Sequence, residues 1–156
     1  QMAASALALR CAADISGNES LSRKAEERVL ELLNLQDEEG FFPEYGGADV
    51  GYHSLTISLL ATYYKRTSHD SVLSALRRAI AFLNRRLFAD ATFDYRLSSR
   101  RTQFLYPSGL VRCHEKNMIA RHLLGCRTGQ VLLPSWMDDR YCFQLATDYL
   151  IAGILE

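Results

Sequence analysis

The chain has 156 residues, of which 48% are hydrophobic and 23% charged, a composition ordinary for one globular domain with a sizeable core. Its 18 Lys and Arg residues balance its 18 Asp and Glu residues, so no net charge draws it to nucleic acid or to an acidic membrane surface. No apolar run approaches the roughly 20 residues that a membrane span needs. We therefore expect a single domain over residues 1–156, with neither nucleic acid nor membrane as a partner.

Six helical segments are predicted, each with a start or a stop signal in the sequence. The first two form a hairpin around Ser16-Gly17-Asn18, and Ser20 or Ser22 is the expected cap of the second. The fourth follows a short turn with Asp70 as its expected N-cap. In chain order the segments cover residues 2–15, about 22–33, from between 49 and 54 to about 66, 70–87, 107–125 and 134–156.

Helices with a polar face alternate with helices that are apolar almost all round. The third segment is of the apolar kind, whereas the fourth carries Arg77, Arg78, Arg85 and Arg86 on a face that we expect to be solvated. No segment shows a period of two bounded by hairpin turns. The pattern predicts an all-α fold of stacked antiparallel helical hairpins in two concentric layers.

A polar, aromatic and glycine-rich loop precedes the third helix, and a looser copy of it follows about fifty residues later. A period in this range is typical of stacked helical hairpins. The corresponding positions are Phe42 and Phe93, Glu44 and Asp94, Tyr45 and Tyr95, and Tyr52 and Tyr106.

Two motifs in these loops resemble those of α/α-toroid proteins, in which helical hairpins close into a double ring. Gln36-x-x-x-Gly40-x-Phe42 is similar to the Q-x-x-x-G-x-W ending of the squalene and hopene cyclase repeat, with Phe in place of Trp. Glu44-Tyr45-Gly46, followed by Ser99-Arg100-Arg101-Thr102 and Tyr106-Pro107, is similar to the toroid domains of polysaccharide lyases of the heparinase and alginate-lyase kind. The resemblance covers roughly residues 30 to 112.

This resemblance implies a partial α/α toroid that binds or processes an oligo- or polysaccharide, acidic ones included, as a polysaccharide lyase or a glycoside hydrolase. Two departures bear on activity. The acidic D-x-D-D-T motif of the cyclases is absent, which leaves a terpenoid cyclase-like function as a minor alternative. The Asn-His motif of the lyases is not found either.

In such a fold the two loops should lie side by side at one rim, with aromatic, acidic and basic side chains together. For elimination, Arg100 or Arg101 would neutralise a uronate and Tyr52 or His53 would remove the proton. For hydrolysis, the paired carboxylates would be Glu44 with Asp49 or Asp94. The expected substrate-binding residues are Tyr45, Asp94, Tyr95, Arg100, Arg101 and Tyr106.

Each of these residues has a structural alternative. Asp49 could only cap the third helix, and Glu44 could form a salt bridge with Arg100 or Arg101. His53 could be a packing residue, and the tyrosines at matching places in the repeat could be wedges between hairpins. The competing hypothesis is therefore a non-catalytic helical repeat scaffold that binds a protein partner.

Four scattered cysteines without a C-x-x-C pair indicate free thiols in a reducing compartment, so we expect a cytoplasmic protein, or a secreted or periplasmic one if a leader was removed. We expect no cofactor and no metal, although His122 and Cys126 would share a helix face. Six helices make about half of a six-hairpin ring, and the chain begins with Gln1. It is expected to be a fragment, an open arc, or a ring completed by a second copy.

Overall fold

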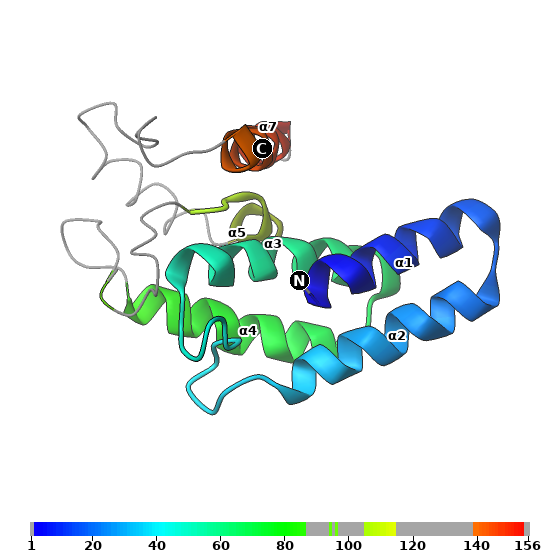
Figure 1. Ribbon diagram of the computed structural model, residues 1–156, viewed down its shortest axis with the longest axis horizontal. Helices are drawn as coiled ribbons and strands as arrows, with labels where there is room; N and C mark the ends of the chain where they lie inside the picture. Colours follow the sequence, from blue (N-terminus) through cyan, green and yellow to red (C-terminus); the bar gives the residue numbers. More distant parts are fainter. Residues whose placement is uncertain (1, 87–93, 95, 97–104, 115–138, 155–156) are drawn as a thin grey trace.

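The computed structural model describes residues 2–86, 94, 96, 105–114 and 139–154 (Figure 1). The regular secondary structure of these residues is helical, and among them β-type pairing occurs as one isolated bridge, between Glu44 and Gly47. The all-α prediction is thus confirmed for this part of the chain. Its helices are α1 (Met2–Ser16), α2 (Glu19–Asn34), α3 (Val50–Thr67), α4 (Asp70–Arg85), α5 (Ser108–Arg112) and α7 (Asp139–Ile154).

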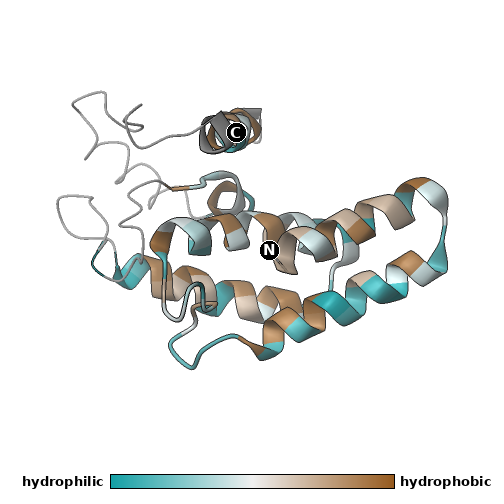
Figure 2. Ribbon diagram, viewed as in Figure 1, coloured by the Kyte–Doolittle hydropathy of each residue, from teal (hydrophilic) through white to brown (hydrophobic). Residues whose placement is uncertain are grey.

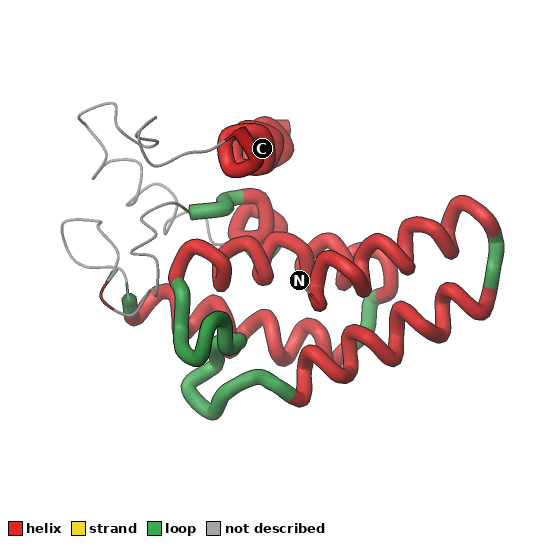
Figure 3. The backbone as a smooth tube through the Cα atoms, viewed as in Figure 1, coloured by secondary structure: helices red, strands yellow, loops and turns green. Residues whose placement is uncertain are grey.

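Two antiparallel hairpins, α1 with α2 and α3 with α4, form the body of the molecule (Figures 1 and 3). Helix α1 lies against α3 and α2 against α4, while α5 packs on the other side of α3 and contacts α7 in turn. The hairpins are therefore stacked, with α1, α3 and α5 in one layer and α2 and α4 in the other. The toroid itself stays a prediction.

Burial explains why α3 takes the central place. Its buried residues, among them Val50, His53, Ile57 and Tyr63, cover most of the helix circumference, and the remaining stripe, with Leu55 and Leu59, is partly buried. Helices α2 and α4 bury one stripe only and expose charged residues on the other, a difference that Figure 2 displays as teal and brown faces. The helix with no polar face must be covered on every side, and here α1, α4 and α5 cover it.

The N-caps of two helices differ from the predicted ones. Asn18, rather than Ser20 or Ser22, caps α2, because its side-chain oxygen accepts a hydrogen bond from the Ser20 backbone N–H at 2.9 Å. His69 occupies the N-cap position of α4, and Asp70 is the first helical residue, where its charge favours the helix dipole.

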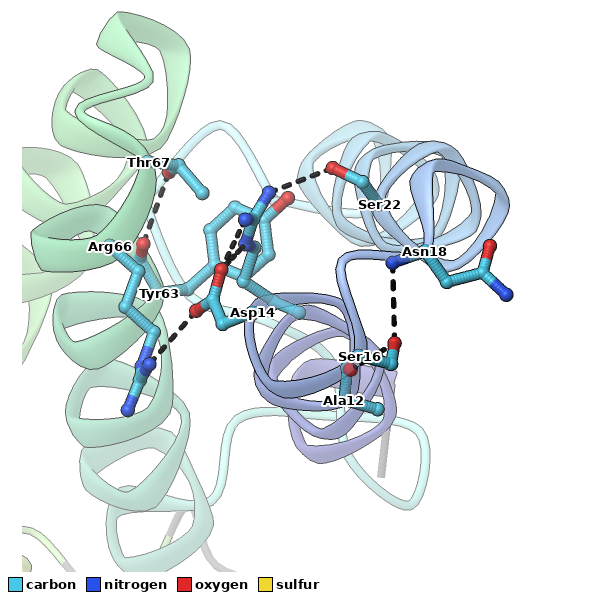
Figure 4. A network of polar contacts seen from close by, with 9 residues as sticks. Ala12, Asp14, Ser16, Asn18, Ser22, Tyr63, Arg66 and Thr67 are labelled. Atoms are coloured by element: carbon cyan, nitrogen blue, oxygen red, sulfur yellow. Dashed lines mark hydrogen bonds and ion pairs between the residues drawn. The ribbon is translucent and has the colours of Figure 1, made fainter.

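A polar network joins the first hairpin to the end of α3 (Figure 4). The Asp14 carboxylate accepts hydrogen bonds from Arg10 at 2.9 Å and from Arg66 at 2.9 Å, and Arg10 also donates to Ser22 Oγ at 2.8 Å. The Arg10 hydrogen bond is the main reason that the pKa of Asp14 lies below its usual value. The network connects α1, α2 and α3 at the end of the molecule away from the α2–α3 loop.

Helix α5 is shorter than predicted. It begins after Pro107, as expected, but ends at Arg112, and His114 then takes a left-handed φ of 62°. The predicted end at Gly125 lies outside the described residues, as do positions 134–138 of the last predicted helix. Because Gly109 has no side chain, α5 can approach the backbone of α3 closely at Ser58.

Candidate functional site at the loop between α2 and α3

Gln36 anchors the start of this loop. Its Nε2 donates to two backbone oxygens, those of Gly40 and Ala75, each at 2.9 Å. Its Oε1 accepts from the Nε of Arg78 at 3.0 Å. One amide side chain thus bonds to its own loop and to two positions on α4, and it holds the loop against that helix.

The other two residues of the motif act beside Gln36. Gly40 has a φ of 102°, a conformation that side chains rarely adopt, and its backbone lies directly against Arg78. Phe42 is buried, 3% exposed, within the core that α3 and α4 share. The Gln36, Gly40 and Phe42 spacing therefore fixes the loop on α4.

The arginines at the end of α4 also bind this loop. Arg85 donates to the backbone oxygen of Glu39 at 2.7 Å, and Arg86 pairs with the Glu39 carboxylate at 2.8 Å. The Arg86 guanidinium lies 4.9 Å from the centre of the Phe82 ring, within cation–π range. The predicted solvated face is confirmed for Arg77, Arg78 and Arg85, which are exposed, whereas Arg86 is half-buried. The sequence did not predict that three of these arginines also bond to Gln36 and Glu39 of the loop.

The tip of the loop is a tight turn from Glu44 to Gly47. These two residues exchange backbone hydrogen bonds of 2.8 and 3.1 Å, and the central residues Tyr45 and Gly46 have φ values of 52° and 84°. Both central φ values are positive, as in the hairpin turn called type I′. Tyr45 is 61% exposed. Its ring packs edge-to-face against the ring of Tyr52, with 5.9 Å between the two centroids.

Asp49 ends the loop and begins α3. Its Oδ1 accepts a hydrogen bond from the Tyr52 backbone N–H at 3.1 Å, and the residue is 1% exposed. This is the N-cap interaction that the sequence offered as the alternative to a catalytic role. A carboxylate that is buried in this way is not accessible to a ligand at the rim.

His53 lies in the core rather than at the rim, with 1% of its surface exposed. Its Nε2 is 2.9 Å from the carbonyl oxygen of Ala79, so this nitrogen carries the proton, and its Nδ1 accepts from the Phe42 N–H at 3.5 Å. Burial lowers the pKa of His53 from 6.5 to about 4, against an opposing effect of the Ala79 hydrogen bond. His53 is thus a neutral side chain that joins α3, α4 and the loop.

The described residues of the second loop contact the end of α4 and the first turns of α3. The Asp94 backbone N–H donates to the Arg86 oxygen at 3.0 Å, and its carboxylate pairs with Arg96 at 2.7 and 3.0 Å, the chief reason that the pKa of Asp94 is lowered. Tyr106 is buried at the first turn of α3, where its N–H donates to Ser54 Oγ at 3.0 Å. The predicted site residues Tyr95, Arg100 and Arg101 lie outside the described part of the chain.

The candidate residues that the structure describes fall into three groups. Glu44, Tyr45 and Tyr52 lie together at the loop tip and the first turn of α3. Asp49, His53 and Tyr106 are buried beneath it, each bonded to neighbouring backbone or side chains. Asp94 adjoins the end of α4.

A buried polar cluster was not predicted. Ser58 Oγ accepts from the Gly109 N–H at 3.1 Å, and Asp148 accepts from the Ser108 N–H at 2.9 Å and from its hydroxyl at 2.5 Å. Desolvation raises the pKa of Asp148, although the Ser108 hydrogen bonds oppose this. The cluster fastens α5 to α3 and α7. Asp148, the one acidic residue in the second half of α7, was the available signal in the sequence.

No group of three His, Cys, Asp or Glu residues that could hold a metal ion occurs among the residues with a described placement. Cys11 and Cys113 are free thiols, and His122 and Cys126 lie outside the described ranges. Within residues 2–86, 105–114 and 139–154, none of the helices has the length and apolar character to span a bilayer.

No family model, curated protein sequence or solved structure matches this chain. The fold itself defines the class: an all-α protein built from stacked antiparallel helical hairpins, whose α2–α3 loop is fixed to α4 and presents a turn with an exposed tyrosine.

Proposed function

We propose that this chain is a carbohydrate-binding protein of the helical-hairpin class, with its ligand surface formed by Glu44, Tyr45, Gly46, Gly47 and Tyr52. We call this set the Tyr45–Tyr52 surface. The observation that carries the proposal is the exposed Tyr45 ring, held at a positive φ beside Tyr52 on an anchored loop.

The chemistry of this surface suits a sugar. A tyrosine ring offers a flat apolar face for the C–H face of a pyranose, and its hydroxyl can bond to sugar hydroxyls. The Glu44 carboxylate lies at the base of the same turn and is partly exposed, so it can accept hydrogen bonds from hydroxyl groups. A left-handed tyrosine costs roughly 1–2 kcal/mol, and strain of this kind is concentrated at functional sites.

The finer proposal is polysaccharide lyase activity, with Tyr52 as base and Arg100 or Arg101 at the uronate. Elimination is favoured over hydrolysis by the burial of Asp49, since hydrolysis needs two carboxylates that face one bond. His53 is not proposed as the base, because its Nε2 proton bonds to Ala79 and its ring is enclosed.

The test is titration of the purified protein with neutral and uronate-containing oligosaccharides, followed by calorimetry and by the ultraviolet absorbance of unsaturated products. The informative variant is Tyr45→Asn, because Asn tolerates a positive φ and removes the ring. It should keep the melting temperature and weaken binding at least about tenfold, the equivalent of roughly 1.4 kcal/mol. Phe143→Ala, a matched exposed aromatic on α7, should bind as the parent does. Equal binding by the parent and Tyr45→Asn would refute the proposal.

A non-catalytic scaffold for a protein partner is the second candidate. Two residues that the sequence suggested as catalytic favour this candidate, because both have structural roles. Asp49 caps α3, and His53 forms a hydrogen bond with α4. Absence of binding to every oligosaccharide, with the fold intact, would favour this candidate.

A further inference from the structure

A groove of about 870 Å³ runs along α4, between α3 and the end of α5. Its floor is apolar: Leu73 and Ala81 from α4 and Tyr64 from α3 keep part of their surface accessible, and the buried Leu76 and Ile80 lie behind them. We call it the α4 groove. Its volume lies in the range of sites that enclose a sizeable ligand, and none of its lining residues belongs to the Tyr45–Tyr52 surface.

Among the residues that the structure describes, the charged side chains around the α4 groove are basic. Lys65, Arg77 and Arg112 line it together with His114, and no Asp or Glu of this part of the chain does. Lys65 and Arg77 are exposed, and neither forms an ion pair with a residue that the structure describes. Arg112 interacts with the charge of Asp148, so its own charge is partly offset. The uncompensated positive charge of the edge therefore comes mainly from Lys65 and Arg77.

The shape of the α4 groove indicates the form of its occupant. The α4 residues that line it run from Leu73 to Asn84 at helical spacing, which corresponds to about 16 Å, or three turns of helix. A straight apolar floor of this length accepts the apolar stripe of an amphipathic helix. Because the edges are basic, the flanks of that helix should be acidic.

We propose that the α4 groove docks an acidic amphipathic helix of a partner protein. The apolar stripe of the partner lies on Leu73, Ala81 and Tyr64, and its carboxylates face Lys65 and Arg77. This interaction is separate from carbohydrate binding and goes beyond it.

The test uses synthetic helical peptides. One carries leucines at i, i+3, i+4 and i+7 with flanking glutamates, the second has the same leucines with flanking lysines, and the third keeps the glutamates but replaces the leucines with glutamine. The first should bind the full chain, measured by fluorescence anisotropy, and the other two should bind at least about tenfold more weakly.

Charge reversal makes the test specific. The double variant Lys65→Glu with Arg77→Glu should weaken the glutamate peptide at least about tenfold and strengthen the lysine peptide, because both charges are at the groove edge. Arg23→Glu with Lys24→Glu is the matched control: both residues are exposed on α2, and the change in net charge is the same. The control should bind the glutamate peptide as the parent does, and circular dichroism should show that both variants remain folded.

Several results would overturn the proposal. These are no binding of the glutamate peptide, equal binding of the glutamate and lysine peptides, or equal weakening by the two double variants. Binding of dodecanoate without binding of the peptide would assign the groove to a small amphiphile. If the protein forms a dimer, and the double variant Lys65→Glu with Arg77→Glu dissociates it, the α4 groove would be assigned to a second copy of the chain. Tyr45→Asn should leave peptide binding unchanged, so failure of the carbohydrate proposal is distinguishable from failure here.

Discussion

The backbone of Gly40 lies directly against the carbonyl group of Arg78. A Cβ placed on Gly40 would overlap the Arg78 oxygen and would lie 2.9 Å from its carbonyl carbon. At Gly40, the loop that carries the Tyr45–Tyr52 surface therefore meets α4 main chain to main chain, with no side chain between them. Contact between two backbones restricts the position of the loop on α4 more than contact through flexible side chains would.

Gly40→Ala should lower the free energy of unfolding by about 2–4 kcal/mol, since Ala is strained at a φ of 102° and its Cβ forces the loop off α4. Urea denaturation measures the change. Gly47→Ala is the control, because nothing lies within 4 Å of a Cβ there and its φ is not positive. Equal stability of Gly40→Ala and the parent would show that the loop moves freely against α4.

Gln36→Glu tests the anchor. The substitution keeps the shape and the acceptor for Arg78, but an ionised carboxylate cannot donate to the Gly40 and Ala75 oxygens. We expect a loss of roughly 1–3 kcal/mol at neutral pH, the usual cost of leaving such acceptors without a donor.

Part of this loss in Gln36→Glu should be recovered as the pH falls, because a protonated Glu can donate again. Chemical denaturation across the acidic range, compared with the parent, measures the recovery. A difference between variant and parent that does not change with pH would contradict the anchor role.

The buried His53 predicts a fall in stability on acidification. Its folded pKa of about 4 lies below its ordinary 6.5, so the unfolded chain takes up the proton first as the pH drops. Its stabilising contribution is complete above pH 6.5 and is lost between pH 6.5 and 4, by about 3 kcal/mol in total.

His53→Gln should flatten this part of the pH profile, because a Gln amide can donate to Ala79 and accept from Phe42 without titrating. The difference between the parent and variant profiles, from denaturation at several pH values, isolates His53. Profiles that run parallel between pH 6.5 and 4 would mean that His53 has the same pKa in the folded and unfolded states, and would contradict the lowered pKa.

Gly109→Ala should loosen α5 from α3. A Cβ there would lie 2.5 Å from the Ser58 Cα and 2.6 Å from its nitrogen, and neither backbone atom can move alone. We expect a loss of about 1–3 kcal/mol, the usual cost of overpacking. Gly153→Ala in α7 has open space around its Cβ and should raise stability by up to about 1 kcal/mol through helix propensity. Thermal melts of the two variants that shift in the same direction would contradict this account.

Much of the helical architecture follows from the sequence, because helix formation depends on signals a few residues apart. The predicted start of α3 at Asp49 to Ser54 and its near-complete burial agree with the structure, since an apolar helix must be covered all round. The predicted N-cap of α4 was one residue too late, and those of α2 were two or four residues too late, because several neighbouring polar residues are each suited to a cap. The spacing of Gln36, Gly40 and Phe42 indicates a motif in the sequence, but the contacts of Gln36 with α4 are visible only in the structure.

The sequence by itself determined which segments become helices and which loops carry the aromatic and charged residues, because hydrophobic period and capping are local properties. Only the tertiary structure decided which of those residues reach solvent. His53 is neighbour to Tyr52 in the chain, yet its partner is the carbonyl oxygen of Ala79, 26 residues away. Whether a side chain lies at the rim or in the core depends on which helix packs over it. That packing is determined by the burial of apolar surface over the whole chain, which is not a local property of the sequence.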